Sequence, residues 1–382
     1  MIAGFAMDEI GLAAQTMFAE LTQQALDAEF DDSYDERGNF IRKRIDGPLY
    51  WYYQRKSEGK LTQKYVGPVK DDAINQRVRH FNELKSDFSK RRRMVRALLA
   101  TGLLSPDPIT GDVIEALWKA GFFRLRGVLV GTAAFQCYSG ILGVRMASSS
   151  LMTQDLDAAQ FYDISHMVSD SIPPILDVLK QVDSSFAPVP NTFYPGQVTR
   201  FRARDVGYAV EFLTPNRGSD RNVGKPAVMP PLGGASATPL RFLDHLIYEP
   251  IRSVVLHKGG IPVTVPSPQR FAVHKLIVAA QRKQNPAKAD KDIMQAEQLI
   301  RASLSKRSLS LFEAWSDAWD RGPSWRASLK QGVSMMRQEI QTDFLFSMET
   351  HGWSERGPAA LRKRKKAPAR KTAKRKVLGK KR

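Results

Sequence analysis

The sequence predicts an α/β (α+β) fold, in which a core with a mixed sheet is flanked by an N-terminal β-meander and a C-terminal helical region. Three observations support this class. Short segments with strand-like alternation lie between segments with helical spacing of apolar residues. Helical patterns dominate from Ser267 to about Met348. The chain of 382 residues is 42% hydrophobic, enough to bury a substantial core and to suggest two or three domains.

The first segment, residues 1–37, is apolar and acidic. It has the hydrophobicity of a signal peptide, but no basic residue precedes Arg37, so we interpret it as a docked amphipathic helix. The single cysteine, Cys137, cannot form an internal disulfide, which fits an expected cytoplasmic location. No apolar run reaches the roughly 18 residues that a membrane-spanning helix needs, so no membrane partner is expected.

Residues 38–105 are expected to form a three-stranded meander and a long helix. The meander breaks at the turn dipeptides Asp46-Gly47 and Glu58-Gly59, and apolar spacings of three, four and seven between residues 70 and 101 predict the helix. Arg91, Arg92 and Arg93 fan out around that helix and indicate a solvated basic face rather than one site.

Aromatic residues of the meander alternate with basic ones, a composition that suits stacking on nucleic-acid bases. The aromatic residues are Tyr50, Trp51, Tyr52, Tyr53 and Tyr65, and the basic ones are Arg42, Arg44, Arg55, Lys60 and Lys64. Because consecutive strand residues point to opposite faces, at most one set of rings is free to bind a ligand. The alternative is that half of those rings face a core.

The segment between residues 125 and 130 is expected to be a strand that leads through Gly131-Thr132 into a helix. A glycine at such a turn lets the backbone approach a ligand, and the first N–H groups of the helix attract anions. Gly131 and Thr132 are therefore a candidate phosphate cradle, although a glycine and a threonine at this place commonly serve only as a helix cap.

A carboxylate pair follows in "LMTQDLDAA". On a short strand, Asp155 and Asp157 project from the same face, where two carboxylates suit a hard cation such as Mg²⁺ or Mn²⁺ holding a triphosphate. The strand "DVGYAVEFLTP" offers a third acid. A charged residue in the middle of an apolar strand is costly unless it is paired or bound to a metal, so Glu211 is the stronger candidate and Asp205 the reserve.

The ordered segments "VLVGTAAF", "MTQDLDAA", "YAVEFLTP", "VTVPSPQRFAVHKLIVAAQR" and "KDIMQAEQLI" resemble the nucleotidyltransferase fold of the DNA polymerase beta superfamily. With the N-terminal "YWYYQ", "GK" and "QKYVGP", they are similar to a bacterial nucleotidyltransferase-like family akin to minimal nucleotidyltransferases and abortive-infection toxins. The resemblance extends from about Asn39 to Ile300.

The resemblance implies specific roles for six residues. Gly131 and Thr132 would contact the nucleotide phosphates, and Lys275 would contact the triphosphate. The metal-binding catalytic acids would be Asp155, Asp157 and Glu211. The sequence departs from the family pattern in the long spacing from Thr132 to Asp155, which is 23 positions further on, and in having Glu rather than the usual Asp at position 211.

The activity implied by the resemblance is two-metal transfer of a nucleoside monophosphate from an NTP, such as ATP, to an acceptor hydroxyl on RNA, with tRNA as one candidate. A role as a toxin or defence component, with an antitoxin partner, is implied in the same way. A non-catalytic nucleic-acid-binding protein that retains the fold and an enzyme that transfers AMP to protein are the alternatives. The expected segments are residues 1–37, 38–105, 106–265, 266–355 and 356–382.

The net charge of +19 is concentrated at the C-terminus, where residues 361–382 contain 13 Lys and Arg and no acid. This tail has no apolar face and is expected to be disordered in isolation, with RNA favoured as its partner through Arg362–Arg382. The alternatives are a solubilising extension or pairing with the acidic head. Residues 216–239 are rich in Gly, Pro and Ser and predict a mobile loop, whose Arg217, Arg221 and Lys225 either touch phosphates or are solvated.

Overall fold

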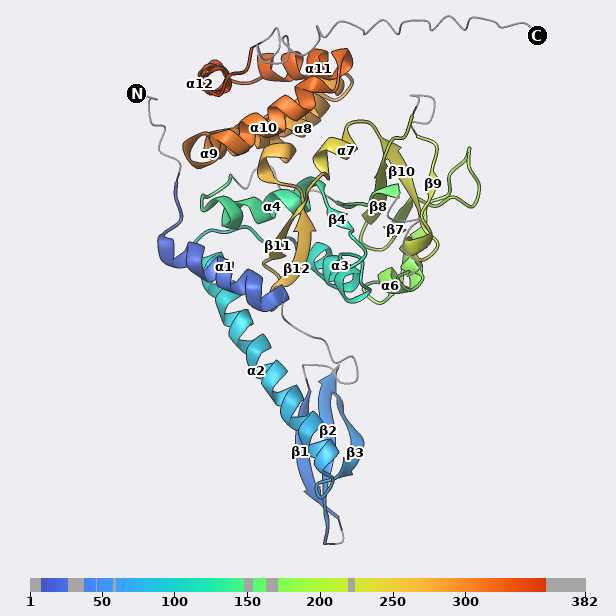
Figure 1. The fold of residues 1–382 in the computed structure, drawn as a ribbon. Helices are drawn as coiled ribbons and strands as arrows, with labels where there is room; N and C mark the ends of the chain where they lie inside the picture. Colours follow the sequence, from blue (N-terminus) through green and yellow to red (C-terminus); the bar gives the residue numbers. More distant parts are fainter. Residues whose placement is uncertain are drawn as a thin grey trace, which may run out of the picture.

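The computed structural model describes residues 8–26, 38–45, 47–57, 60–147, 154–162, 171–218 and 224–354. It combines helices and sheets in the mixed class that the sequence predicts (Figure 1). The helices among the described residues are α1 (Leu12–Leu26), α2 (Asp72–Ala100), α3 (Pro108–Lys119), α4 (Gly131–Leu142), α6 (Ile175–Lys180), η3 (Pro230–Leu232), α7 (Leu243–Leu246), α8 (Pro268–Gln281), α9 (Pro286–Lys306), α10 (Ser308–Asp320), α11 (Pro323–Ser334) and α12 (Gln338–Thr350).

In the described part of the chain, the strands form three sheets. Their bounds are β1 (Asn39–Arg44), β2 (Leu49–Ser57), β3 (Lys60–Pro68), β4 (Val128–Leu129), β5 (Asp155–Ala159), β6 (Phe186–Pro188), β7 (Arg200–Ala203), β8 (Tyr208–Pro215), β9 (Ala227–Val228), β10 (Ser236–Leu240), β11 (Ile251–Val255) and β12 (Ile261–Val265). β1, β2 and β3 form the predicted antiparallel meander, and β11 and β12 pair as an antiparallel hairpin.

The central sheet is mixed and has the strand order β4-β5-β8-β10-β9, with β7 paired to β8 and β6 paired to β7. β5, β8 and β10 run parallel, whereas β4, β7 and β9 run antiparallel to their partners. The inner strand β8 is buried along most of its length, which explains its nearly continuous apolar sequence.

The N-terminal helix packs against the body of the protein, as its amphipathic pattern predicts. Phe18 and Leu21 of α1 share a hydrophobic cluster with Val95 and Leu98 near the end of α2, and Val254 of β11 completes it. The long helix α2 therefore starts beside the meander and ends against α1 at the edge of the main part of the molecule (Figure 1).

Two local predictions are wrong. The strand expected at residues 125–130 contains only Val128–Leu129, because the preceding residues turn and Arg126 has a positive φ of 60°. The predicted mobile loop at residues 216–239 instead contains β9, η3 and most of β10. Thr238–Leu240 of β10 pair with β8 and Ser236–Ala237 pair with β9, and Gly233 and Gly234 supply positive φ angles at the turn before β10. Residues 219–223, including Arg221, lie outside the described part.

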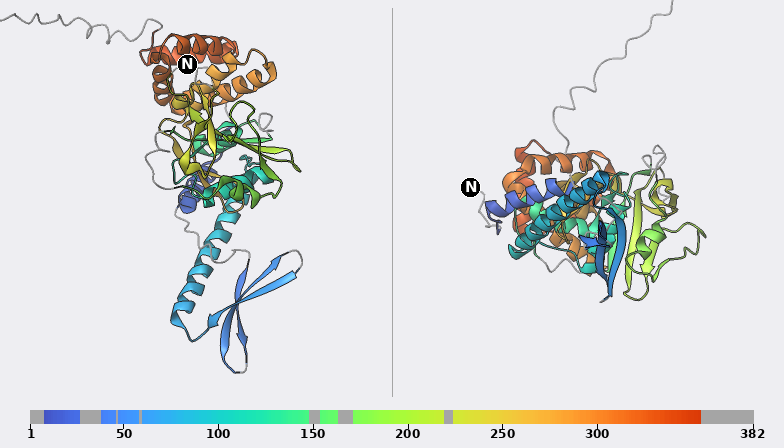
Figure 2. Two further views of the ribbon diagram at one scale, coloured as in Figure 1. Left: turned by 90° about the vertical axis from the view of Figure 1, so that its right-hand side faces the viewer. Right: turned by 90° about the horizontal axis from the view of Figure 1, so that it is seen from below.

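Helices α8 to α12 gather on one side of the central sheet, at the opposite end of the molecule from the meander (Figures 1 and 2). This helical region confirms the pattern seen from Ser267 onwards. Among the described residues, none of the helices is both long enough and apolar enough to cross a membrane. The boundaries of the five expected segments stay a prediction, and the basic tail lies outside the described residues.

Candidate active site

The turn between β4 and α4 lies directly against β5. Val130, the last residue before α4, donates its backbone N–H to the carbonyl of Asp157 over 3.1 Å. Gly131 begins the helix with a φ of +64°, and a Cβ at this position would lie 2.8 Å from Asp157 Oδ2. Both the backbone angle and the close approach require glycine. The predicted cradle is thus a helix N-terminus next to a carboxylate.

The register of the central sheet brings the three predicted acids to one face. Asp155 and Asp157 are two residues apart on β5, and Asp157 is directly opposite Glu211 in the parallel pairing with β8. Directly paired residues of neighbouring strands project from the same face of a sheet. Glu211 accepts a hydrogen bond of 3.1 Å from Thr238 Oγ1 on β10 and is opposite Arg200 of β7.

Ionisation of Asp157 is unfavourable on this face, because two other carboxylates lie nearby. Burial, with the negative charges of Asp155 and Glu211, raises the pKa of Asp157 from 3.8 to about 6, and Lys275 and Arg200 oppose this rise. Asp157 and the two carboxylates that help to raise its pKa form a set of hard oxygen donors that a divalent cation would stabilise.

The reserve acid, Asp205, lies elsewhere. It is exposed in the turn between β7 and β8, and its backbone N–H donates to Ser185 Oγ over 3.3 Å. Glu211, not Asp205, therefore joins the paired aspartates, as the sequence argument favoured.

Two lysines from the helical region approach the same place. Lys275 of α8 forms an ion pair of 2.5 Å with Asp292 of α9 and lies close enough to Asp157 to lower the pKa of that carboxyl. Lys291 of α9 donates to Thr132 Oγ1 over 3.3 Å. Burial and, after it, the charge of Lys275 lower the pKa of Lys291, while the carboxylates of Asp292 and Asp155 oppose this.

Sequence reasoning missed Lys291, Arg200 and Thr238. Lys291 is the first residue of the segment "KDIMQAEQLI", which carries part of the family resemblance. Its position in the sequence does not distinguish it from other lysines on helix surfaces. Arg200 and Thr238 are brought to the site by strand pairing, which alternation within each strand does not reveal.

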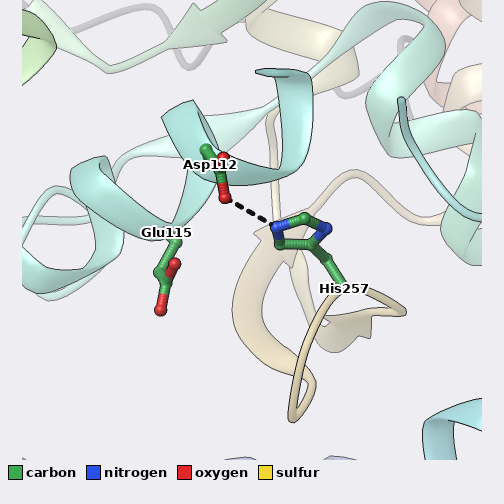
Figure 3. Close-up of side chains that lie close together, drawn as sticks. All are labelled: Asp112, Glu115 and His257. Atoms are coloured by element: carbon green, nitrogen blue, oxygen red, sulfur yellow. Dashed lines mark hydrogen bonds and ion pairs between the residues drawn. The ribbon is translucent and has the colours of Figure 1, made fainter. Parts of the chain in front are cut away.

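A second acidic group lies on α3. Asp112, Glu115 and His257, the last from the connection between β11 and β12, have ligand atoms within 4.8 Å of one another (Figure 3). The ammonium group of Lys258 lies 2.6 Å from Asp112 and 2.5 Å from Glu115. Burial raises the pKa of Asp112, but hydrogen bonds from Lys258 and His257 outweigh it and leave this pKa below its usual value. Lys258 already supplies the positive charge here, so the group fits an ion-pair cluster better than a metal site.

The comparison with known families identifies the class of protein. A family model described as Nucleotidyltransferase matches residues 109–320, a range that covers more than half of the 382 residues and includes every predicted site residue. The chain belongs to this nucleotidyltransferase family, which indicates nucleotidyl transfer from a nucleoside triphosphate. A second model, described as a domain of unknown function (DUF6788), matches residues 18–76, from the middle of α1 to the start of α2.

The other comparisons add little. Among solved structures, an antigenic nucleotidyltransferase-like protein from Paracoccidioides brasiliensis is similar, with 14% identity over 60% of this chain and 95% of that chain and a TM-score of 0.29. A similarity of this extent supports no statement about the site. No curated protein matches the chain significantly.

Proposed function

We propose that this protein transfers a nucleoside monophosphate from a nucleoside triphosphate to an acceptor hydroxyl, with RNA favoured as the acceptor. One observation carries the proposal. The strand register places Asp157 opposite Glu211, with Asp155 on the same face and the Gly131 turn in contact with Asp157. A set of carboxylates beside a helix N-terminus is suited to a metal-bound triphosphate.

The residues present fit Mg²⁺ or Mn²⁺, which the family resemblance implies. Asp155, Asp157 and Glu211 are hard oxygen donors, and burial together with the charges of the other two acids raises the pKa of Asp157, a cost that a bound divalent cation would offset. A bound divalent cation would neutralise the triphosphate and stabilise the charge that develops at the phosphate under attack.

The remaining roles fall to groups of the chain itself. The first N–H groups of α4, at Gly131 and Thr132, would bind phosphate oxygens, and Lys275 and Lys291 would add positive charge beside them. Asp157 or Glu211 would accept the proton of the acceptor hydroxyl as the new phosphate ester forms and pyrophosphate leaves.

The direct test incubates the purified protein with each α-labelled nucleoside triphosphate, Mg²⁺ and total RNA. The proposal expects label to enter RNA, and ribonuclease to release it. If only protease releases the label, the acceptor is a protein rather than RNA. Absence of transfer to either, with retained RNA binding, would support a non-catalytic nucleic-acid-binding protein.

We further propose a role as a toxin or defence component, which rests on the family resemblance alone. Induced expression of the wild-type chain should then arrest bacterial growth, and the Asp155→Ala/Asp157→Ala variant should not. Equal growth with both proteins at equal levels would contradict this role.

A further inference from the structure

The meander is a basic module that lies away from the part of the protein that contains the candidate active site. It lies at the far end of α2, as two views of the molecule show (Figures 1 and 2). β1, β2 and β3 together contain seven Lys and Arg and no Asp or Glu. Residues 38–100, the meander and its helix, contain 16 Lys and Arg against six Asp and Glu. Outside the C-terminal tail, this module therefore holds the main excess of positive charge.

One face of the meander is used for packing. Trp51 and Tyr53 are 9% and 8% exposed, and Trp51 Nε1 donates to Asn75 Oδ1 on α2 over 2.9 Å. Phe40 and Phe81 pack edge to face beside Tyr53, with a distance of 5.0 Å between the two phenylalanine ring centroids. These rings attach the sheet to its helix and are not available to a ligand.

The opposite face carries a second group of rings. Tyr65 of β3 lies between Tyr50 and Tyr52 of β2, with ring centroids 5.8 and 5.6 Å apart, and is 53% exposed. Lys43 lies 5.1 Å from the ring centroid of Tyr52 and donates to Gln63. The pairing register places Lys56 on the same face. Three clustered tyrosines with amide and ammonium groups around them form a surface that is aromatic and polar rather than simply apolar.

We propose that this face, defined by Tyr50, Tyr52, Tyr65, Lys43 and Lys56, binds single-stranded nucleic acid and presents the acceptor strand to the catalytic body. The inference rests on the proposed function only in naming the bound strand as the acceptor. Tyrosine rings stack on any base, because every base has a π-face, and lysines neutralise the neighbouring phosphates. The charge of the three strands, entirely positive, fits a polyanion and gives no complement to a basic partner.

The test measures binding of the full-length chain to a fluorescein-labelled single-stranded RNA of mixed sequence, without nucleotide or divalent metal. Fluorescence anisotropy at low and at raised salt separates stacking from electrostatic attraction, because the electrostatic part weakens steeply with salt. A duplex of the same sequence is the second probe.

The informative variant is Tyr50→Ala/Tyr52→Ala/Tyr65→Ala, which we expect to weaken single-strand binding about tenfold or more at raised salt. The matched variant Tyr50→Phe/Tyr52→Phe/Tyr65→Phe keeps the rings and should bind nearly as the wild type does. Phe346→Ala, an exposed ring on α12, controls for loss of an unrelated aromatic side chain. Thermal melting of each variant reports whether the fold is retained.

Unchanged binding by the folded alanine variant would overturn the proposal, as would equal losses in the alanine and phenylalanine variants. Tighter binding of the duplex, unaffected by the alanine variant, would also overturn it. If the alanine variant still bound RNA but no longer bound an acidic protein that the wild type binds, the face would be assigned to that protein, and the proposal would be overturned.

The outcome is separable from that of the proposed function. The Asp155→Ala/Asp157→Ala variant should bind the single strand as the wild type does while losing nucleotide transfer. Normal transfer to a short acceptor by the tyrosine variant, with weakened binding of a long one, would locate the defect in acceptor binding alone.

Discussion

At the scale of single residues, Gly131 gives the sharpest prediction. Gly131→Ala should abolish nucleotide binding and lower the free energy of unfolding by about 1 to 3 kcal/mol, because a Cβ would meet Asp157 and the φ is positive. The matched control is Gly207→Ala, whose φ is +66° but whose Cβ would enter open space. It should lose stability without losing nucleotide binding, measured by calorimetry. Normal nucleotide binding by the folded Gly131→Ala variant would show that the turn at Gly131 does not bind the phosphates.

The ionised carboxylate of Asp157 is expected to lower the stability of the folded protein when no metal is bound. Its folded-state pKa, about 6, is above the unfolded value of 3.8, so its ionisation destabilises the fold progressively from about pH 4 to pH 6 and fully above pH 6. Asp157→Asn should raise the free energy of unfolding at pH 7.5 by about 1 to 2 kcal/mol and change little below pH 4.

Denaturant unfolding across this pH range, in metal-free buffer, checks the prediction. Asp183 is the control of opposite sign, since hydrogen bonds from Ser185 lower its pKa. Asp183→Asn should lose stability above pH 4, where the carboxylate is charged. A loss of stability in Asp157→Asn at pH 7.5 would contradict the predicted repulsion.

At the scale of elements, the sequence revealed what lies within one element but not what pairs with it. The alternation around Asp155 and Asp157 shows that they share a face, because side chains of a strand alternate. That β8 lies beside β5 with Glu211 opposite Asp157 is a property of the assembled sheet. The cost of a charge within an apolar strand and the family resemblance both pointed to Glu211, but neither predicted this register.

The error at residues 216–239 has the same origin. Ser236 to Leu240 has weak strand character of its own, since Ser, Ala and Pro are poor strand formers, and follows two glycines. Its pairing with β8 makes it a strand, and this tertiary contact overrides local propensity. The helices from Ser267 onwards were predicted because each carries its own apolar stripe.

Helix α9 provides a prediction about a residue that the sequence did not single out. Lys291→Ala should weaken binding of a nucleoside triphosphate about tenfold, since it removes a cation next to Thr132 and the α4 N-terminus. Lys283→Ala, an exposed lysine before α9, is the matched control and should bind normally. Titration calorimetry measures both. Equal affinities for the two variants would show that Lys291 does not contact the nucleotide.

At the scale of the whole molecule, positive charge is concentrated in two segments of the sequence. The meander module and the tail are basic, while the part between them carries the acids of the site. This distribution favours a long polyanion that contacts several parts of the protein at once, because separate weak contacts add through their effective concentration.

Truncation after Ala360 removes 13 Lys and Arg and tests the contribution of the tail. The affinity for RNA at low salt should fall, and the slope of log affinity against log salt should become shallower, because fewer counterions are released. Binding of nucleotide and metal should stay unchanged. A slope equal to that of the full chain would show that the tail does not contact RNA.

The central claim is that Asp155, Asp157 and Glu211 hold a divalent cation, and Mn²⁺ binding followed by electron paramagnetic resonance tests it most directly. We predict that Asp155→Ala/Asp157→Ala loses tight Mn²⁺ binding in the presence of nucleotide, whereas Asp112→Asn/Glu115→Gln retains it, because Lys258 already neutralises the second group. Retained binding by the first variant, with loss in the second, would contradict the account and move the metal site to α3.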